Sequence, residues 1–351
     1  MIASDGLVEL SACPAHMPEG WTPPVPAWGA GHTSDESVSV LYVGVEKPES
    51  GVLSTLDRIV SRTPPDVADA ARFTSRGGCE TRVRILYFAS HSARVKWEHA
   101  SGFADWFADG THLLAGYGLW KEVYDVEPGR FETLISTPDG FEGLARRYGE
   151  SVGPIREHAY WGGMEDRIPA SASEDLTSAL GAMPEPRHSD TRGQSIQVSG
   201  PRNLCLIRSG QDLTGADAGE RDEYADTIEP HLSRGLAFLG EHPETGCFSS
   251  RYMTQLDADG RLLAKTFGMQ LFLSVAHMAR WARHHPSHMR IFDSFQAMAK
   301  WREGEFALRL WHEVVITQAG GMVAEYVNCD PATGLLPFRH ALEPRSERPL
   351  P

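Results

Sequence analysis

Apolar and polar residues alternate most regularly in the segment FALRLWHEVVIT, residues 306–317. Every second position from Phe306 to Ile316 is apolar, except that position 312 is a histidine. Side chains at every second position of a β-strand share one face of the sheet. The pattern therefore predicts a strand in which His312 points with the apolar side chains.

A helical pattern precedes this strand, in PSHMRIFDSFQAM, residues 286–298. Pro286 suits the first turn of a helix because its missing N–H is not needed there. Apolar residues between Ile291 and Met298 recur at helical spacing, and His288 lies on the same face. Two imidazoles directed into apolar surroundings are either core histidines with hydrogen-bond partners or groups that face a buried ligand.

The same patterns predict most of the other elements. The predicted strands cover residues 38–46, 81–90, 130–137, 203–210, 247–257 and 261–270. The predicted helices cover residues 51–62, 141–150, 222–240 and 271–283. The composition of residues 169–194, rich in Ser, Ala, Pro and Asp, predicts a loop over most of that length.

The predicted elements occur twice in the same order. VLYVGVE at 40–46 matches CLIRSGQ at 205–211, and RFETLIST at 130–137 matches LRLWHEVVIT at 308–317. This repeat predicts an α+β fold of duplicated ferredoxin-like units with antiparallel sheets and a cavity between sheets and helices. The expected parts are an extended N-terminal arm (1–36), a first half (37–137), connecting helix and loops (138–196), and a second half with the C-terminal tail (197–351).

Length and charge narrow the class of protein. The chain has 351 residues, enough for two packed units, and its 33 basic and 47 acidic residues give a formal net charge of −14. Such a charge disfavours nucleic acid and anionic lipid as partners. We expect a cytoplasmic protein, because no apolar run approaches the length of a membrane span and the first residues lack the basic leader of an export signal.

The cysteines and histidines limit the possible metal sites. The five cysteines are far apart and never form a CxxC pair, which argues against a disulfide framework, a zinc knuckle and covalently attached haem. His284, His285 and His288 have spacings that can suit zinc, but no Glu lies between them as in HExxH. A non-covalent haem needs only one imidazole on the iron, with other groups directing the chemistry from the opposite side. For haem, His288 suits the axial position and His312 the distal one.

Three other polar residues are candidates, and each has an ordinary structural alternative. Ser209 ends the strand face of Cys205 and Ile207, where it could simply cap the following turn. Glu132 could be a solvated carboxylate at a sheet edge, and Arg167 could be a surface charge. The residue types alone leave both interpretations open.

Several segments resemble the aldoxime dehydratase family, haem enzymes that are often named phenylacetaldoxime dehydratases. The resemblance runs from about Trp21 to Pro337 and is most specific in HPSHMRIF and IRSGQD. It also includes PPVPAW, RFETL, REHAYWGGMEDRIP, LRLWHEV and EYVNCDPATGLLP. The chain is therefore expected to share the fold and chemistry of this family.

The resemblance implies a b-type haem, active in the ferrous form, and a homodimer. It implies that His288 is the axial ligand, His312 the distal catalytic histidine, and Ser209 a hydrogen-bond partner of the substrate oxygen. Arg167 and Glu132 would support the distal histidine. The implied reaction converts an aldoxime, R–CH=N–OH, to the nitrile and water, with the oxime nitrogen bound to ferrous iron and His312 protonating the leaving hydroxyl.

The sequence departs from the family pattern at two positions. Trp311 replaces the usual Tyr, and Ala27 replaces a larger Met, which is expected to enlarge or reshape the pocket. Three alternatives remain at this point: a haem enzyme of peroxide or oxyanion chemistry on a related dimeric α+β barrel, a haem-binding sensor or carrier without turnover, and a soluble α+β protein with no cofactor. Ser209 together with His312 argues against the first, and a sensor would tolerate the loss of His312.

Overall fold

The computed structural model describes residues 6–10 and 14–348, so parts of the predicted N-terminal arm lie outside the described residues.

The structure contains two units of strands and helices. The first unit contains β2 (Val38–Glu46), α1 (Ser50–Arg62), β3 (Val67–Thr74), β4 (Glu80–Phe88), α2 (His91–Ala100), α3 (Phe103–Phe107) and β5 (Gly118–Val126). The second contains β9 (Cys205–Asp212), α5 (Ala218–Thr227), α6 (Glu229–Glu241), β10 (Cys247–Leu256), β11 (Leu262–Phe272), α7 (Val275–His284), α8 (Pro286–Trp301) and β12 (Arg309–Ile316).

Both units order their four strands in the same way. The first reads β5-β2-β4-β3 across the sheet and the second β12-β9-β11-β10, with antiparallel pairing throughout. The units join where β3 pairs with β10, which makes one continuous sheet. The remaining elements are β1 (Gly29–Ala30), β6 (Phe131–Ile135), β7 (Ser151–Val152), α4 (Gly163–Asp166), β8 (Ser195–Ser199), β13 (Met322–Val327) and β14 (Glu343–Arg348).

The structure corrects one of the internal correspondences. The fourth strand of the first unit is β5, which the sequence patterns did not predict, and not the segment 130–137. The true counterpart of LWHEV at 310–314 is LWKEV at 119–123, so Lys121 takes the position of His312. β6 pairs instead with β12, while β13 from the C-terminal part extends the first unit beside β5. The two units therefore exchange strands, and their boundaries are not sequential.

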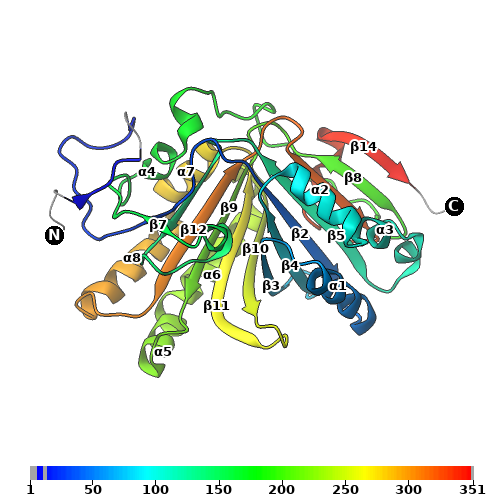
Figure 1. Ribbon diagram of the computed structural model, residues 1–351, viewed down its shortest axis with the longest axis horizontal. Helices are drawn as coiled ribbons and strands as arrows, with labels where there is room; N and C mark the ends of the chain where they lie inside the picture. The colour runs from blue at the N-terminus through cyan, green and yellow to red at the C-terminus, as the bar shows by residue number, and fades with distance from the viewer. Residues whose placement is uncertain (1–5, 11–13, 349–351) are drawn as a thin grey trace.

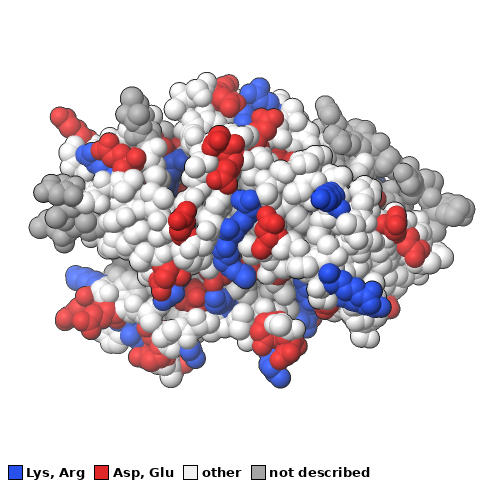
Figure 2. Space-filling model, in the orientation of Figure 1, with Lys and Arg blue, Asp and Glu red and all other residues white. Residues whose placement is uncertain are grey.

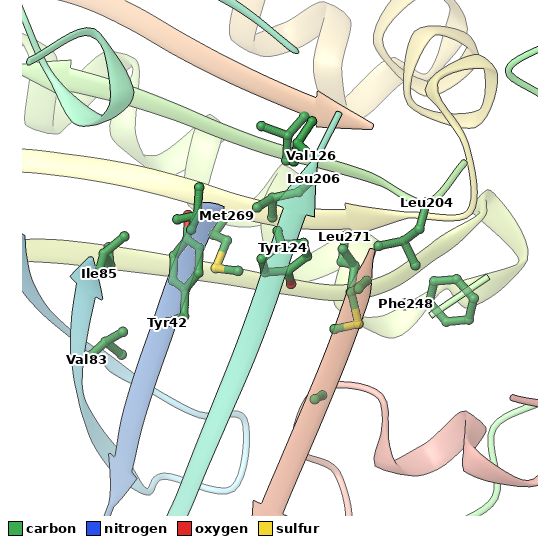
Figure 3. Packing of buried hydrophobic residues seen from close by; sticks show 14 of the residues in the cluster. Tyr42, Val83, Ile85, Tyr124, Val126, Leu204, Leu206, Phe248, Met269 and Leu271 are labelled. Atoms are coloured by element: carbon green, nitrogen blue, oxygen red, sulfur yellow. The ribbon is translucent and has the colours of Figure 1, made fainter. Parts of the chain in front are cut away.

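The two units pack the inner faces of their strands against each other and cover the outer faces with helices (Figure 1). Figure 3 shows Tyr42 and Tyr124 of the first unit facing Leu206 and Met269 of the second. A second core lies between the first unit and its helices α1, α2 and α3. A third, under α6 and α7, contains Cys205, Val314 and Ile316. This third core borders the cavity described below.

Local chemistry explains where two predicted helices differ from the observed ones. The segment 222–240 forms two helices, because Pro230 cannot continue α5 but fits the first turn of α6. Within the segment 141–150, only residues 143–147 are helical, as one 3₁₀ turn. The Leu144 backbone N–H there donates to the buried carboxylate of Glu313 rather than to a helix partner.

The described cysteines Cys79, Cys205, Cys247 and Cys329 form no disulfide, and Cys13 lies outside the described residues. Within residues 6–10 and 14–348, no helix combines the length and apolar character that crossing a membrane requires. On the face drawn in Figure 2, acidic and basic side chains are interspersed.

Candidate active site

Three of the predicted site residues form one hydrogen-bonded cluster. Nε2 of His312 lies 2.8 Å from Oε1 of Glu132, and Nε of Arg167 donates to the other carboxylate oxygen at 2.8 Å. Nη2 of Arg167 also lies 3.0 Å from Nε2 of His312. The Glu132 and Arg167 side chains are only 2 % and 3 % exposed, while His312 is 21 % exposed. The cluster therefore holds one accessible imidazole against a buried ion pair.

Strand register brings two of these residues and Ser209 onto one sheet face. β12 lies between β6 and β9, and its His312 is directly opposite Ser209 on β9. Val314, two residues further on, is opposite Glu132 on β6. Because residues i and i+2 of a strand share a face, Glu132, His312 and Ser209 all project from the helix-covered side of the sheet. Ser209 is half-buried beside the cluster.

Arg167 reaches the cluster from outside the sheet. It follows the single turn of α4, and its backbone N–H bonds back to the carbonyls of Gly163 and Met164. Its Nη1 donates to the carbonyl of Glu157 at 2.6 Å. The guanidinium is thus bonded on three sides, to a backbone carbonyl, a carboxylate and an imidazole. The alternative of a surface charge is wrong for Arg167, and that of a solvated carboxylate is wrong for Glu132.

The electrostatics of the cluster keep Glu132 ionised. Burial alone would raise the pKa of this carboxyl, but the positive charge of Arg167 and the contact with His312 outweigh burial and hold the pKa at about 2. A neutral His312 ring can accept the hydrogen bond of Arg167 at Nε2, and a protonated ring can donate from Nε2 to Glu132. Both protonation states of His312 therefore have a partner in the cluster.

A cavity of about 390 Å³ opens beside His312, within the usual range for small-molecule pockets, about 300–1,000 Å³. Leu134 and Ile207 line it from the sheet, and Met278 and Ala282 from α7. Further lining residues come from the α4 region, from His16 and from the end of α7: Ala159, Tyr160, Trp161, Gly162, Met164, Glu165, Arg167, Ala279, Arg280, Arg283 and His284.

His288 does not line the same cavity as His312. Its ring packs edge-on against Trp281, with centroids 4.9 Å apart, and lies 6.3 Å from the ring of Trp161. Burial lowers the pKa of His288, although the backbone of Ala282 partly offsets this effect. Its buried Nδ1 makes no hydrogen bond within the described part of the chain. Trp161 and Ala282, which contact His288, line the cavity from its other side.

The neighbouring histidines have different surroundings. His285 caps the start of α8 by accepting from the Ser287 N–H, and it stacks on Phe238. His284 is exposed at the cavity rim. Within the described ranges no group of three or more His, Cys, Asp or Glu side chains could hold a metal ion. The zinc spacing of the three histidines is therefore not realised as a site.

The two departures from the family pattern both lie away from the cavity. Trp311 points into the core between the units, where its ring lies 4.8 Å from the Arg208 guanidinium. Ala27 is buried, but it is not among the cavity-lining residues. The expectation that Ala27 enlarges or reshapes the pocket stays a prediction. Trp161 and Trp281 were not predicted as site residues; only Trp161, within the segment REHAYWGGMEDRIP, had a sequence signal.

Comparison with known proteins decides the family. A model of the family described as haem-containing dehydratase matches residues 42–335. The chain belongs to this family. It is 32% identical to the aliphatic aldoxime dehydratase of Pseudomonas chlororaphis, over 91% of this chain and 93% of that protein. It is also 32% identical to the phenylacetaldoxime dehydratase of Bacillus sp. (strain OxB-1), over 93% and 95% of the two chains.

A solved structure agrees with this assignment to the haem-containing dehydratases. The crystal structure of an aldoxime dehydratase in complex with butyraldoxime superposes with a TM-score of 0.84 at 30% sequence identity, covering 95% of each chain. The resemblance seen in the sequence and the expectation of haem are both confirmed.

The residues present fit a haem. A half-buried imidazole whose buried Nδ1 makes no hydrogen bond to the described residues is a suitable iron ligand, and His288 provides one. The lining of Leu134, Ile207 and Met278 suits an apolar macrocycle, and the accessible His312 lines the same cavity. His288 would hold the iron, and His312 with Ser209 would act on a bound substrate.

Proposed function

We propose that this protein dehydrates aldoximes to nitriles in a haem-dependent reaction. The balanced reaction is R–CH=N–OH to R–C≡N plus H₂O. The N–O bond and the C–H bond break, the carbon–nitrogen double bond becomes a triple bond, and no net oxidation occurs. The observation that carries the proposal is the His312–Glu132–Arg167 cluster, which presents one imidazole to an apolar cavity in a haem-containing dehydratase.

Hydroxide is a poor leaving group, so the oxime oxygen must receive a proton. Haem held by His288 would supply a ferrous iron that donates electron density to the oxime nitrogen and weakens the N–O bond. His312 transfers the proton to the oxygen from Nδ1, which has no hydrogen-bond partner among the described residues, while Nε2 stays on Glu132. The ring then accepts the proton that leaves carbon, and general acid help of this kind contributes about 10² to 10⁴ in rate.

The other residues position these groups. Ser209, opposite His312 on the next strand, donates to the oxime oxygen and keeps it within reach of the imidazole. Glu132 stabilises the protonated ring, and Arg167 fixes the Glu132 carboxylate. The apolar lining from Leu134, Ile207 and Met278 suits aldoximes with alkyl or arylalkyl groups and excludes water from the reacting atoms.

We also infer the finer architecture. The identical strand order in both units supports duplicated ferredoxin-like units of the dimeric α+β barrel type, with haem in the cavity between sheet and helices. His16 of the N-terminal arm and residues 159–162, 164, 165 and 167 of the connecting region 138–196 then form the outer wall, since they line the cavity. A homodimer, implied by the family resemblance, can be tested by sedimentation.

The proposed function is tested with the purified haem-loaded protein, reduced by dithionite without oxygen. Butyraldoxime and phenylacetaldoxime are supplied separately, and the nitriles are measured by gas chromatography. We expect nitrile from at least one substrate, loss of turnover with retained haem in His312→Asn, and full turnover in Lys121→Ala, which changes the equivalent position of the first unit. Absence of nitrile from reduced, haem-loaded protein, or full turnover by His312→Asn, would contradict the proposal.

A further inference from the structure

The end of α7 places two arginines at the rim of the cavity. Arg280 and Arg283 lie three residues apart on one helix face, and both line the cavity and are exposed. Met278 and Ala282 line the cavity from the same helix, and Met278 is buried against the core. α7 therefore offers the cavity an apolar wall with a cationic rim.

The side chains described for residues 6–10 and 14–342 offer these arginines no partner. Within those ranges, neither Arg280 nor Arg283 makes an ion pair or a side-chain hydrogen bond, whereas Arg167 inside the cavity is bonded on three sides. Arg283 also suits the carbonyl end of α7, where a cation is favoured by the helix dipole. That role, however, leaves the donors of both guanidinium groups available to a ligand.

The charge at this rim contrasts with the rest of the chain. The formal net charge is −14, yet Glu165 is the one carboxylate among the described residues that line the cavity. Glu165 lies 3.8 Å from His16, so part of its charge is offset when that histidine is protonated. A ligand with an apolar body and carboxylates at one edge matches this distribution.

We propose that Arg280 and Arg283 bind the two propionate carboxylates of haem at the cavity rim. The inference rests on the proposed haem-dependent function and adds to it the residues that orient the cofactor. The planar guanidinium suits a carboxylate because it can donate two parallel hydrogen bonds to the two oxygens. The apolar side chains of Met278 and Ala282 then contact the macrocycle from the same helix.

The test compares haem with haem dimethyl ester, in which both carboxylates are masked. The full chain, prepared without haem, is titrated with each compound in the same co-solvent, and binding is followed by absorbance of the bound pigment. We expect the wild-type protein to prefer haem to the ester. Arg280→Gln and Arg283→Gln should each reduce the affinity for haem by up to about fivefold, because exposed ion pairs contribute modestly, and should leave the affinity for the ester unchanged.

Three further measurements make the outcome decisive. Arg62→Gln is the matched control, because Arg62 is an exposed arginine in the last turn of α1, far from the cavity lining, and it should keep the wild-type preference. Arg280→Lys with Arg283→Lys should retain part of the preference, and added salt should reduce it. Equal wild-type affinity for haem and ester, or an unchanged preference in the Arg280→Gln/Arg283→Gln double variant, would overturn the inference while leaving the haem assignment intact. Failure of the chain to bind either compound would overturn both.

Discussion

Trp311 packs flat over Gly210, its partner on the neighbouring strand β9. A Cβ on Gly210 would lie 2.3 Å from the indole ring, closer than atoms can approach. The first unit repeats this pair, since Trp120 lies over Gly44 on β2 with a corresponding distance of 2.0 Å. Each Gly–Trp pair specifies the register of its two strands, and in the second unit this register places His312 opposite Ser209.

Gly210→Ala should therefore destabilise the protein by about 1–3 kcal/mol, because the buried indole has no space to move without disturbing the core. Urea denaturation followed by circular dichroism measures this effect. Gly215→Ala is the control, since the nearest side-chain atom to its added Cβ is 3.8 Å away. Equal stability of the two variants would show that Trp311 accommodates the methyl group and does not specify register.

Glu132→Gln should lower kcat on the order of 10²-fold, because the protonated His312 loses its anionic partner. It should also cost about 3–5 kcal/mol of stability, since Arg167 is left as a buried unpaired charge. Steady-state kinetics and denaturation are the measurements. Glu325→Gln, on β13 beside Lys121, is a control for loss of a carboxylate on a strand. A kcat unchanged in Glu132→Gln would remove Glu132 from the mechanism.

Acid should destabilise the protein in two stages. Burial, and then the charge of Arg167, lower the pKa of His158 to about 4, so the folded state keeps this ring neutral while the unfolded chain gains a proton below about pH 6.5. Stability should therefore fall between pH 6.5 and 4. The depressed pKa of Glu132, about 2, adds stability that is full above pH 4.5 and is lost as the pH falls toward 2.

Denaturation midpoints measured from pH 7.5 to 3.5 test this behaviour. His158→Gln should flatten the dependence between pH 6.5 and 4, because the residue no longer titrates, and should leave the loss below pH 4.5 in place. A His158→Gln protein with the wild-type dependence over the upper range would show that other groups cause the decline.

His288→Ala should fail to take up haem, because the proposed iron ligand is lost. Haem binding should also quench tryptophan fluorescence, since Trp281 and Trp161 both contact His288. Absorption and fluorescence titrations follow the two signals. His284→Ala should keep the absorption spectrum of haem bound to the wild type. If this spectrum were lost in His284→Ala but retained in His288→Ala, His284 and not His288 would be the iron ligand.

Ser209→Ala should lower kcat/KM by about tenfold or more, the usual cost of losing one hydrogen bond to a polarised oxygen. Binding of haem should be unchanged, because Ser209 is not proposed to contact it. The comparison is Ser250→Ala, a serine of β10 outside the cavity lining. Ser209 does not end its strand, since β9 continues to Asp212, so wild-type kinetics in Ser209→Ala would remove Ser209 from the mechanism without restoring that alternative.

The sequence identified most of the candidate site residues, some from local patterns and others only from resemblance to a family. The face of His312 followed from strand alternation, and the helix of His288 from apolar spacing and Pro286. Ser209, Glu132 and Arg167 were distinguished only by resemblance to a family, because each residue type is common at turns and surfaces. β5 was not predicted at all, and its absence led to the wrong internal match of residues 130–137 with β12.

The sequence by itself determined the local conformations around both histidines, because alternation and capping depend on residues a few positions apart. Only the tertiary structure decided that β6 lies beside β12 and that Arg167 meets a histidine 145 residues further along the chain. Such contacts depend on how the sheet closes and on burial of an ion pair, and neither leaves a periodic signal. The same limit applies to the surroundings of the His288 ring, which lies beside Trp161 and Trp281.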